Sequence, residues 1–197
     1  MNVLHIDSSI MGAGSASRAI SAAVIERLRE TDPGIGVVYR DLVAEPLAHL
    51  TLDTFMTLDT GADVQQLLDA DVVVIGAGFY NFSIPSQLKA WIDRIAVRGK
   101  TFAYGETGPV GLVAGKRVIV ALARGNVYHD GAPYAAFEHA ETLLRSAFTF
   151  IGVTDLHFII AEGLGRGEDA RRAAIDAALA EVRQLSPVDD TRAELTA

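Results

Sequence analysis

Residues 71–94 read DVVVIGAGFYNFSIPSQLKAWIDR, and the rest of the chain is organised around this stretch. It begins with an uninterrupted apolar run, Val72 to Ile75, which is typical of a strand buried on both faces in a parallel sheet. Two glycines are then expected to break the strand, and an aromatic turn follows at Phe79 to Phe82. Pro85 opens a helix whose apolar residues recur at helical spacing. Because open α/β sheets bind ligands where their strands end, this turn is a candidate ligand site.

Four further strands are expected outside this stretch, at residues 3–7, 36–42, 116–122 and 156–161. Helical patterns fall between the strands, so the predicted fold class is α/β. Right-handed crossovers leave few topologies, and we expect a flavodoxin-like, doubly wound, five-stranded parallel sheet of order 2-1-3-4-5 in a three-layer α/β/α arrangement. Residues 1–197 form a single domain in this prediction, with the last ~12 residues frayed. The glycine-rich stretch 99–115 is expected to be a long loop or an irregular hairpin.

The composition excludes several classes of protein. The chain has 197 residues, a net charge of −8 and no cysteine. The lack of cysteine excludes disulfides, thiolate catalysis and thiolate metal sites, and it fits a reducing, cytoplasmic location. No basic patch indicates nucleic-acid binding, and no apolar run reaches the ~18–20 residues that a membrane span needs. Strand-like residues begin at Asn2, so no secretion signal is expected, and the histidines show no metal-ligand spacing.

The loop after the first strand, Ser8 to Ser17, is small and rich in hydroxyl groups. It contains neither the GxGxxG fingerprint of a dinucleotide fold nor the Walker pattern. Ser9, Ser15 and Ser17 instead surround the start of a helix, where hydroxyl and backbone N–H groups can bind a phosphate without a lysine. The alternative is that Ser15 or Ser17 only caps the helix. The loop alone leaves both interpretations open.

The ends of the third and fourth strands add two further candidate loops, at Phe79 to Phe82 and Ala123 to Asn126. Taken alone, the first could be an apolar cover over the sheet and the second an ordinary glycine turn. In the expected strand order, however, the first, third and fourth strands are neighbours, so their three loops converge. A phosphate site beside an aromatic platform implies a mononucleotide with a flat head group, and FMN is the natural candidate.

Motifs along nearly the whole chain resemble the FMN-dependent NADH-azoreductases, a flavodoxin-like family that also comprises NADH:quinone oxidoreductases. The matching stretches are Ser8-Ser9 with Ser15-Ala16-Ser17, Tyr80-Asn81-Phe82 with Gln87-Leu88-Lys89, residues 108–116, Arg124-Gly125 with Asp130-Gly131, and residues 150–155 with Ala161-Glu162-Gly163.

This sequence departs from the family pattern at three places. Phe79 stands where the family usually has methionine, and Ala123 and Asn126 stand where it usually has serine and glycine. Backbone contacts survive these changes, whereas a serine hydroxyl contact at position 123 is lost. The segment 46–71 is also shorter than in the family, which bears on the range of substrates.

The resemblance implies a set of cofactor-binding residues in the three loops. They are Ser9, Ser15, Ala16 and Ser17 for the phosphate and ribityl end, and Phe79, Tyr80, Asn81, Phe82, Ala123, Arg124, Gly125 and Asn126 around the isoalloxazine. Backbone N–H groups of Gly125 and Asn126 are candidates to stabilise negative charge on the reduced ring. Asn81 and Tyr128 are expected to orient the acceptor, and His129 either assists them or is an exposed loop residue.

The function that the resemblance implies is FMN-dependent oxidoreduction. NADH or NADPH would pass a hydride to the flavin and leave, and a quinone or azo compound would then accept the electrons, in ping-pong fashion. A homodimer with two flavin sites at its interface is also implied. Trp91, Phe79, Phe82 and Phe102 are expected to supply exposed apolar surface for it. The stretch 99–115 and Tyr128 could wall a substrate pocket.

Two other classes of function remain as alternatives. One is a flavodoxin-type FMN electron carrier without its own small-molecule substrate. Such carriers present a strongly acidic face around the flavin, and the three loops here contain few carboxylates. The other is a flavin-free regulator or hydrolase, which neither a G-x-S-x-G elbow nor an acidic phosphorylation pocket supports.

Overall fold

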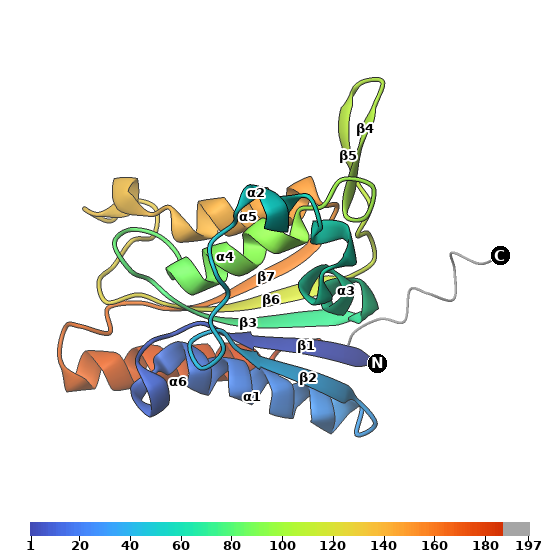
Figure 1. Cartoon of the computed structure of the whole chain (residues 1–197). Coiled ribbons are helices and arrows are strands. Elements are labelled where there is room, and N and C mark those ends of the chain that lie inside the picture. The colour runs from blue at the N-terminus through green and yellow to red at the C-terminus, as the bar shows by residue number, and fades with distance from the viewer. Residues whose placement is uncertain (187–197) are drawn as a thin grey trace.

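A computed structural model describes residues 1–186 of the chain, and the prediction of a frayed C-terminal end concerns residues outside this range. One five-stranded sheet forms its centre, in the order β2-β1-β3-β6-β7, with every neighbouring pair parallel (Figure 1). Renumbered by sheet strands alone, this is the predicted order 2-1-3-4-5. The strands are β1 (Asn2–Asp7), β2 (Gly36–Asp41), β3 (Val72–Gly78), β6 (Arg117–Ala123) and β7 (Asp155–Ala161).

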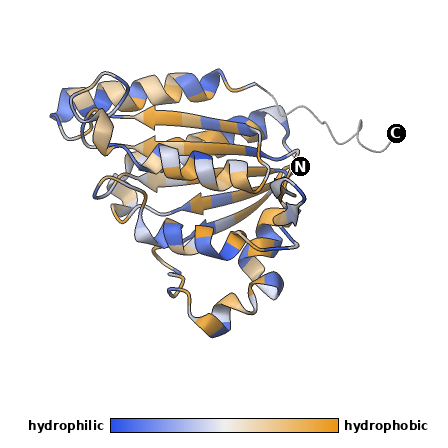
Figure 2. Cartoon of the chain, turned by 90° about the horizontal axis from the view of Figure 1, so that it is seen from above, coloured by the Kyte–Doolittle hydropathy of each residue, from blue (hydrophilic) through white to orange (hydrophobic). Residues whose placement is uncertain are grey.

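Helices lie on both faces of this sheet (Figure 1). One face is covered by α1 (Ala16–Thr31) and α6 (Glu168–Arg183), whose apolar residues pack with the sheet in one core cluster. The opposite face is covered by α3 (Ala62–Asp69), α4 (Ser86–Ile95) and α5 (Ala140–Phe150), which build a second cluster. Figure 2 shows that the strands of the central sheet are mainly apolar, whereas the helices contain both polar and apolar residues. Short helical turns follow at α2 (Leu52–Phe55), η1 (Gly12–Gly14), η2 (Leu58–Thr60) and η3 (Ala135–Phe137).

The strand β3 is buried along its whole length, as its apolar run predicted. The prediction that two glycines break it is wrong, because the strand continues through Gly78, which pairs with Ala123 of β6. These glycines permit close approach rather than a turn. A Cβ on Gly76 would lie 2.1 Å from a carboxylate oxygen of Asp7, and one on Gly78 would lie 2.7 Å from the ring of Tyr80. The strand end is therefore a surface on which neighbouring side chains rest directly.

The stretch 99–115, which was expected to be a long loop or an irregular hairpin, contains an antiparallel hairpin. Its strands are β4 (Phe102–Gly105) and β5 (Gly108–Gly111), and they form a separate two-stranded sheet. The hairpin projects from the end of the molecule at which the strands of the central sheet begin (Figure 1). The loops after β1, β3 and β6 lie at the opposite end, so this hairpin does not wall a pocket there within one chain.

Two of the aromatic residues expected at an exposed edge are buried. Trp91 is inaccessible and packs near Phe148 in the core, and Phe102 is buried against Phe150. Phe82 does reach the surface, where half of it is exposed. Other large apolar side chains are exposed along the chain, among them Leu52, Phe55, Met56, Tyr104, Val110 and Leu112. No helix within residues 1–186 is long and apolar enough to cross a membrane.

Candidate functional site

Three loops meet at the carboxyl end of the sheet, as predicted. The Ser9 hydroxyl, after β1, lies 3.0 Å from the Tyr80 hydroxyl, after β3. The backbone N–H of Phe79 donates to the carbonyl of Ala123 at 2.9 Å, which joins the ends of β3 and β6. The rings of Phe79 and Tyr128 contact each other with centroids 4.5 Å apart. Residues of the three loops, at 8–17, 79–82 and 123–128, therefore contact one another, and we call these loops the rim.

The start of α1 combines a side-chain cap with unused backbone donors. The Ser15 hydroxyl accepts a hydrogen bond from the N–H of Arg18 at 3.3 Å, so Ser15 is the N-cap. It also lies 3.1 Å from the buried Ser17 hydroxyl. Within residues 1–186, the N–H groups of Ala16 and Ser17 have no acceptor. After capping, two backbone donors and two hydroxyl groups remain at this helix N-terminus, and such groups can bind an anion.

The turn after β3 is tight and has an unusual backbone. Tyr80 and Ser83 exchange two backbone hydrogen bonds, at 2.9 and 3.1 Å. Between them, Asn81 and Phe82 have φ values of 47° and 74°, in the left-handed region. This is the conformation of a type I′ turn, which usually contains glycine or asparagine, and it costs energy at a phenylalanine. Strained residues of this kind gather at functional sites. Here the strain places both side chains at the exposed tip of the rim.

The segment after β6 presents its backbone to the rim and buries its arginine. The side chain of Arg124 is 2% exposed and lies 3.0 Å from carboxylate oxygens of Glu138 and Glu141, and 3.7 Å from Glu162. The backbone of Arg124 is also paired, because its N–H donates to the carbonyl of Ala161 at 2.8 Å and its carbonyl accepts from the N–H of Leu164 at 3.1 Å. The N–H groups of Gly125 and Asn126 donate to no acceptor in the described part of the chain.

The two residues predicted to orient an acceptor lie in different loops of the rim. Tyr128 stands between Phe79 and Tyr134, and its N–H donates to Glu162 at 2.9 Å. Asn81 is exposed at the turn described above. His129 has a side chain 65% exposed, which fits the alternative of an exposed loop residue.

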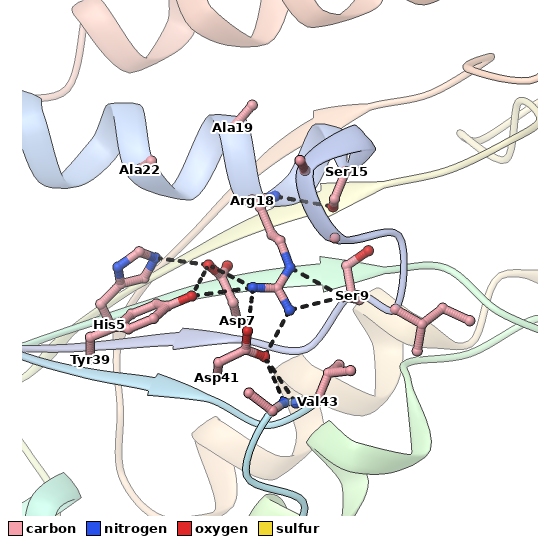
Figure 3. A pocket seen from close by; sticks show the side chains of 14 residues that line it. His5, Asp7, Ser9, Ser15, Arg18, Ala19, Ala22, Tyr39, Asp41 and Val43 are labelled. Carbon is pink, nitrogen blue, oxygen red and sulfur yellow. Dashed lines mark hydrogen bonds and ion pairs between the residues drawn. The ribbon is translucent and has the colours of Figure 1, made fainter.

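A cavity of about 720 Å³ opens beside the β1 loop, toward β2 (Figure 3). Its lining includes Ser9 and Ser15 but no residue of the loops after β3 and β6. Its other polar residues are Arg18 and four side chains from the two strands, namely His5 and Asp7 of β1 and Tyr39 and Asp41 of β2.

The charges of this cluster interact strongly. The hydrogen bonds from Arg18 lower the pKa of Asp41 to about 2. Burial and the nearby Asp7 carboxylate raise the pKa of Tyr39 to about 12. Burial lowers the pKa of His5, so this histidine is held neutral at pH 7. The cluster thus contains one cation and two carboxylates, together with neutral Tyr39 and His5.

Sequence reasoning missed this cluster and a second arginine. Arg171 of α6 donates to the carbonyl of Gly14 at 2.6 Å and so supports the far end of the β1 loop. A signal for the cluster was present, because Asp7 and Asp41 close two adjacent parallel strands and are paired in register. Arg18 follows Ser17 in the predicted helix start. No local pattern indicated Arg171, which is distant in the sequence.

Known proteins resemble this chain over nearly its full length. Residues 1–185 match the family described as having a flavodoxin-like fold. An FMN-dependent NADH:quinone oxidoreductase from a Bradyrhizobium species is 50% identical over 200 residues, covering 94% of this chain and all of the relative.

Two solved structures are also similar to this chain over most of its length. The azoreductase of Bacillus anthracis str. Sterne superposes with a TM-score of 0.85 at 30% identity, covering 93% of this chain and 97% of that one. An FMN-dependent NADH-azoreductase from Bacillus anthracis str. Ames Ancestor, in complex with FMN, has a TM-score of 0.80 at 24% identity, with 93% and 97% covered, and it supports the fold.

Proposed function

This chain belongs to the flavodoxin-like family of FMN-dependent NADH:quinone oxidoreductases and azoreductases, and we propose that its three-loop rim is the FMN site at which both substrates react in turn. The protein is an FMN-dependent oxidoreductase that uses NADH or NADPH to reduce quinones, azo compounds or both. The observation that carries the assignment of the site is the convergence of unused donors from separate loops on one rim.

The residues of the rim fit the two ends of FMN. A phosphate is matched by the N–H groups of Ala16 and Ser17 and the hydroxyl groups of Ser9, Ser15 and Ser17. A flat ring with polar edges is matched by the aromatic side chains of the loop at 79–82 and by the backbone N–H groups of Gly125 and Asn126. When bound, FMN supplies hydride acceptance from the nicotinamide and electron transfer to the acceptor.

The protein contributes orientation and fixed dipoles to this chemistry. The N–H groups of Gly125 and Asn126 favour negative charge at the ring because they are available, and the carbonyls of both residues are held by the N–H groups of Gly165 and Gly163. Asn81, in the turn after β3, and Tyr128, beside Phe79, orient the quinone or azo acceptor. A single site serving both substrates requires the oxidised nucleotide to leave first, which is ping-pong kinetics.

The test is direct reduction of the FMN-loaded protein. With NADH or NADPH in an anaerobic cuvette, we expect the flavin absorbance to bleach within minutes and to return on addition of a small benzoquinone or an azo dye. Initial rates at several acceptor concentrations should give parallel double-reciprocal lines. Intersecting lines would contradict a shared site, and no bleaching by either nucleotide would favour the electron-carrier alternative.

A homodimer is part of this proposal. Exposed Tyr104, Val110 and Leu112 lie on or beside the projecting hairpin, and such apolar surface favours association with a second copy. Light scattering at micromolar concentration should give twice the 21.0 kDa mass of one chain. A single-chain mass would contradict it. The cytoplasmic location remains a prediction.

A further inference from the structure

One side chain beside the β1 loop joins three separate elements. The guanidinium of Arg18, in the first turn of α1, donates from Nε and Nη2 to the carbonyl of Ser9, at 3.1 and 3.0 Å. It also donates to both carboxylate oxygens of Asp41, at 2.8 and 2.7 Å, and to the Tyr39 hydroxyl at 3.2 Å. Figure 3 shows this arrangement, which we call the Arg18 bridge.

The bridge uses the whole hydrogen-bonding capacity of the arginine. A guanidinium has five N–H groups, and the five bonds of the bridge occupy all of them. Arg18 therefore has no donor left for a phosphate bound at the neighbouring helix N-terminus. Its charge is also offset by Asp41 and by Asp7, whose carboxylate lies 3.7 Å away. Direct attraction of a ligand is consequently not its role.

The position of this arginine is unfavourable without its partners. A cation in the first turn of a helix opposes the helix dipole, which favours anions there. Asp41 compensates for this, and Asp41 is itself held by the backbone N–H groups of Val43 and Ala44, at 2.9 and 3.3 Å. The bridge is thus fixed from the β2 side and acts on the β1 loop.

The bridge acts on the loop through a single peptide group. A trans peptide directs its C=O and N–H to opposite sides. With the Ser9 carbonyl bound to Arg18, the N–H of Ile10 points the other way, where it donates to the Tyr80 hydroxyl at 3.2 Å. The same hydroxyl contacts the Ser9 hydroxyl. The Ser9–Ile10 peptide therefore connects α1 and β2 on one side with the turn after β3 on the other.

We propose that Arg18 is a positioning residue for the phosphate end of FMN, acting through the Ser9–Ile10 peptide and not through a bond to the ligand. The proposal rests on the proposed function. By directing the Ser9 carbonyl toward a cation, the bridge keeps that oxygen from facing the phosphate, which would repel it. By orienting the N–H of Ile10 toward the Tyr80 hydroxyl, the bridge holds the β1 loop against the turn after β3. The phosphate end and the ring end of the site thus keep a fixed position relative to each other.

The first test separates geometry from charge. Arg18→Lys keeps the positive charge but lacks the planar fork that bridges a carbonyl and a carboxylate. We expect FMN affinity to fall roughly tenfold or more, the loss of one charge-assisted bond, and riboflavin affinity to fall less. Arg29→Met, an exposed arginine on the same helix, is the control and should bind as the wild type does. Wild-type FMN affinity in Arg18→Lys would overturn the proposal.

The second test asks whether Arg18 and Tyr80 act through the same peptide. The double variant Arg18→Lys with Tyr80→Phe should bind FMN about as tightly as the single variant with the lower FMN affinity, because either change alone releases the Ser9–Ile10 peptide. If the two losses multiply, the proposal is wrong.

The third test does not need the flavin. In the flavin-free protein, exchange of the Ile10 amide hydrogen should be slower in the wild type and Arg29→Met than in Arg18→Lys. Equal exchange in all three would overturn the bridge. Failure of the wild type to bind FMN, with Ile10 still protected, would instead locate the fault in the proposed function.

Discussion

The β1 and β6 loops of the rim are both supported by an arginine, but the two arginines have different partners. Arg18 binds the backbone carbonyl of Ser9 and one aspartate, and its side chain is 16% exposed. Arg124 binds three glutamates that come from around α5 and from the end of β7, and its side chain is 2% exposed. The first arginine therefore binds the backbone of its loop directly. The second ties together the elements beneath its loop.

This difference predicts that a change at Arg124 affects folding more than ligand choice. Arg124→Met leaves three carboxylates around a buried position, and breaking a buried ion pair costs about 3–5 kcal/mol. Urea unfolding of the flavin-free protein should show a loss of that size. Arg145→Met, which removes the exposed partner of the same Glu141, should cost about 0–1 kcal/mol. Equal losses for the two variants would remove the distinction between the arginines.

The β1 loop should respond through ligand affinity instead. Replacing Ser15 and Ser17 by alanine removes two hydroxyl groups at the proposed phosphate site. FMN affinity should then fall roughly a hundredfold, since each bond to a charged group is worth ~1.5–3 kcal/mol. Riboflavin, which lacks the phosphate, should lose much less.

The control for this pair is Ser146→Ala, on the exposed face of α5, which should change neither affinity. Loss of the Ser15 cap should lower the free energy of unfolding by about 1 kcal/mol, whether or not the serines also bind a phosphate. Equal losses of FMN and riboflavin affinity would mean that the serines only cap α1.

The smallest expected effect is the loss of stability at low pH that comes from Asp41, the partner of Arg18. The pKa of Asp41 is lowered in the folded protein to about 2, from 3.8, so the folded state binds its proton less tightly than the unfolded state. Its contribution to stability is present above about pH 4 and is lost as the pH falls toward about 2. Stability measured between these limits should fall less steeply in Asp41→Asn than in the wild type. Identical slopes would show that Arg18 does not hold this carboxylate.

The sheet and the location of the proposed site follow from local patterns in the sequence. The apolar run of β3 and the alternation of strands with helices suffice to place three loops at one edge, because parallel strands all end on the same side. The serines after β1 and the aromatic turn after β3 are adjacent to those strands, so the sequence alone suffices to propose them as site residues.

The errors have a common physical cause, which is contact between residues distant in the sequence. Gly76 suggested a break, but it is needed because Asp7 rests on it from the neighbouring strand. Trp91 suggested an exposed edge, yet α5 covers it with Phe148. The Arg18 bridge was missed for the same reason, since its meaning depends on Asp41 from another strand. A single sequence does not reveal such pairs unless the register is known.

The turn at Asn81 and Phe82 has a consequence for the chirality of the chain. Its backbone has the handedness that suits mirror-image amino acids, although both residues are of the ordinary L form. Two hydrogen bonds between Tyr80 and Ser83, and a third from the N–H of His139 to the carbonyl of Phe82, hold it there. D-residues introduced by chemical synthesis would thus be accommodated at these two positions of the rim, whereas in the adjoining strand β3 they would disrupt the pleat. The shape of this part of the site is imposed by the surrounding fold and opposed by the stereochemistry of its own residues.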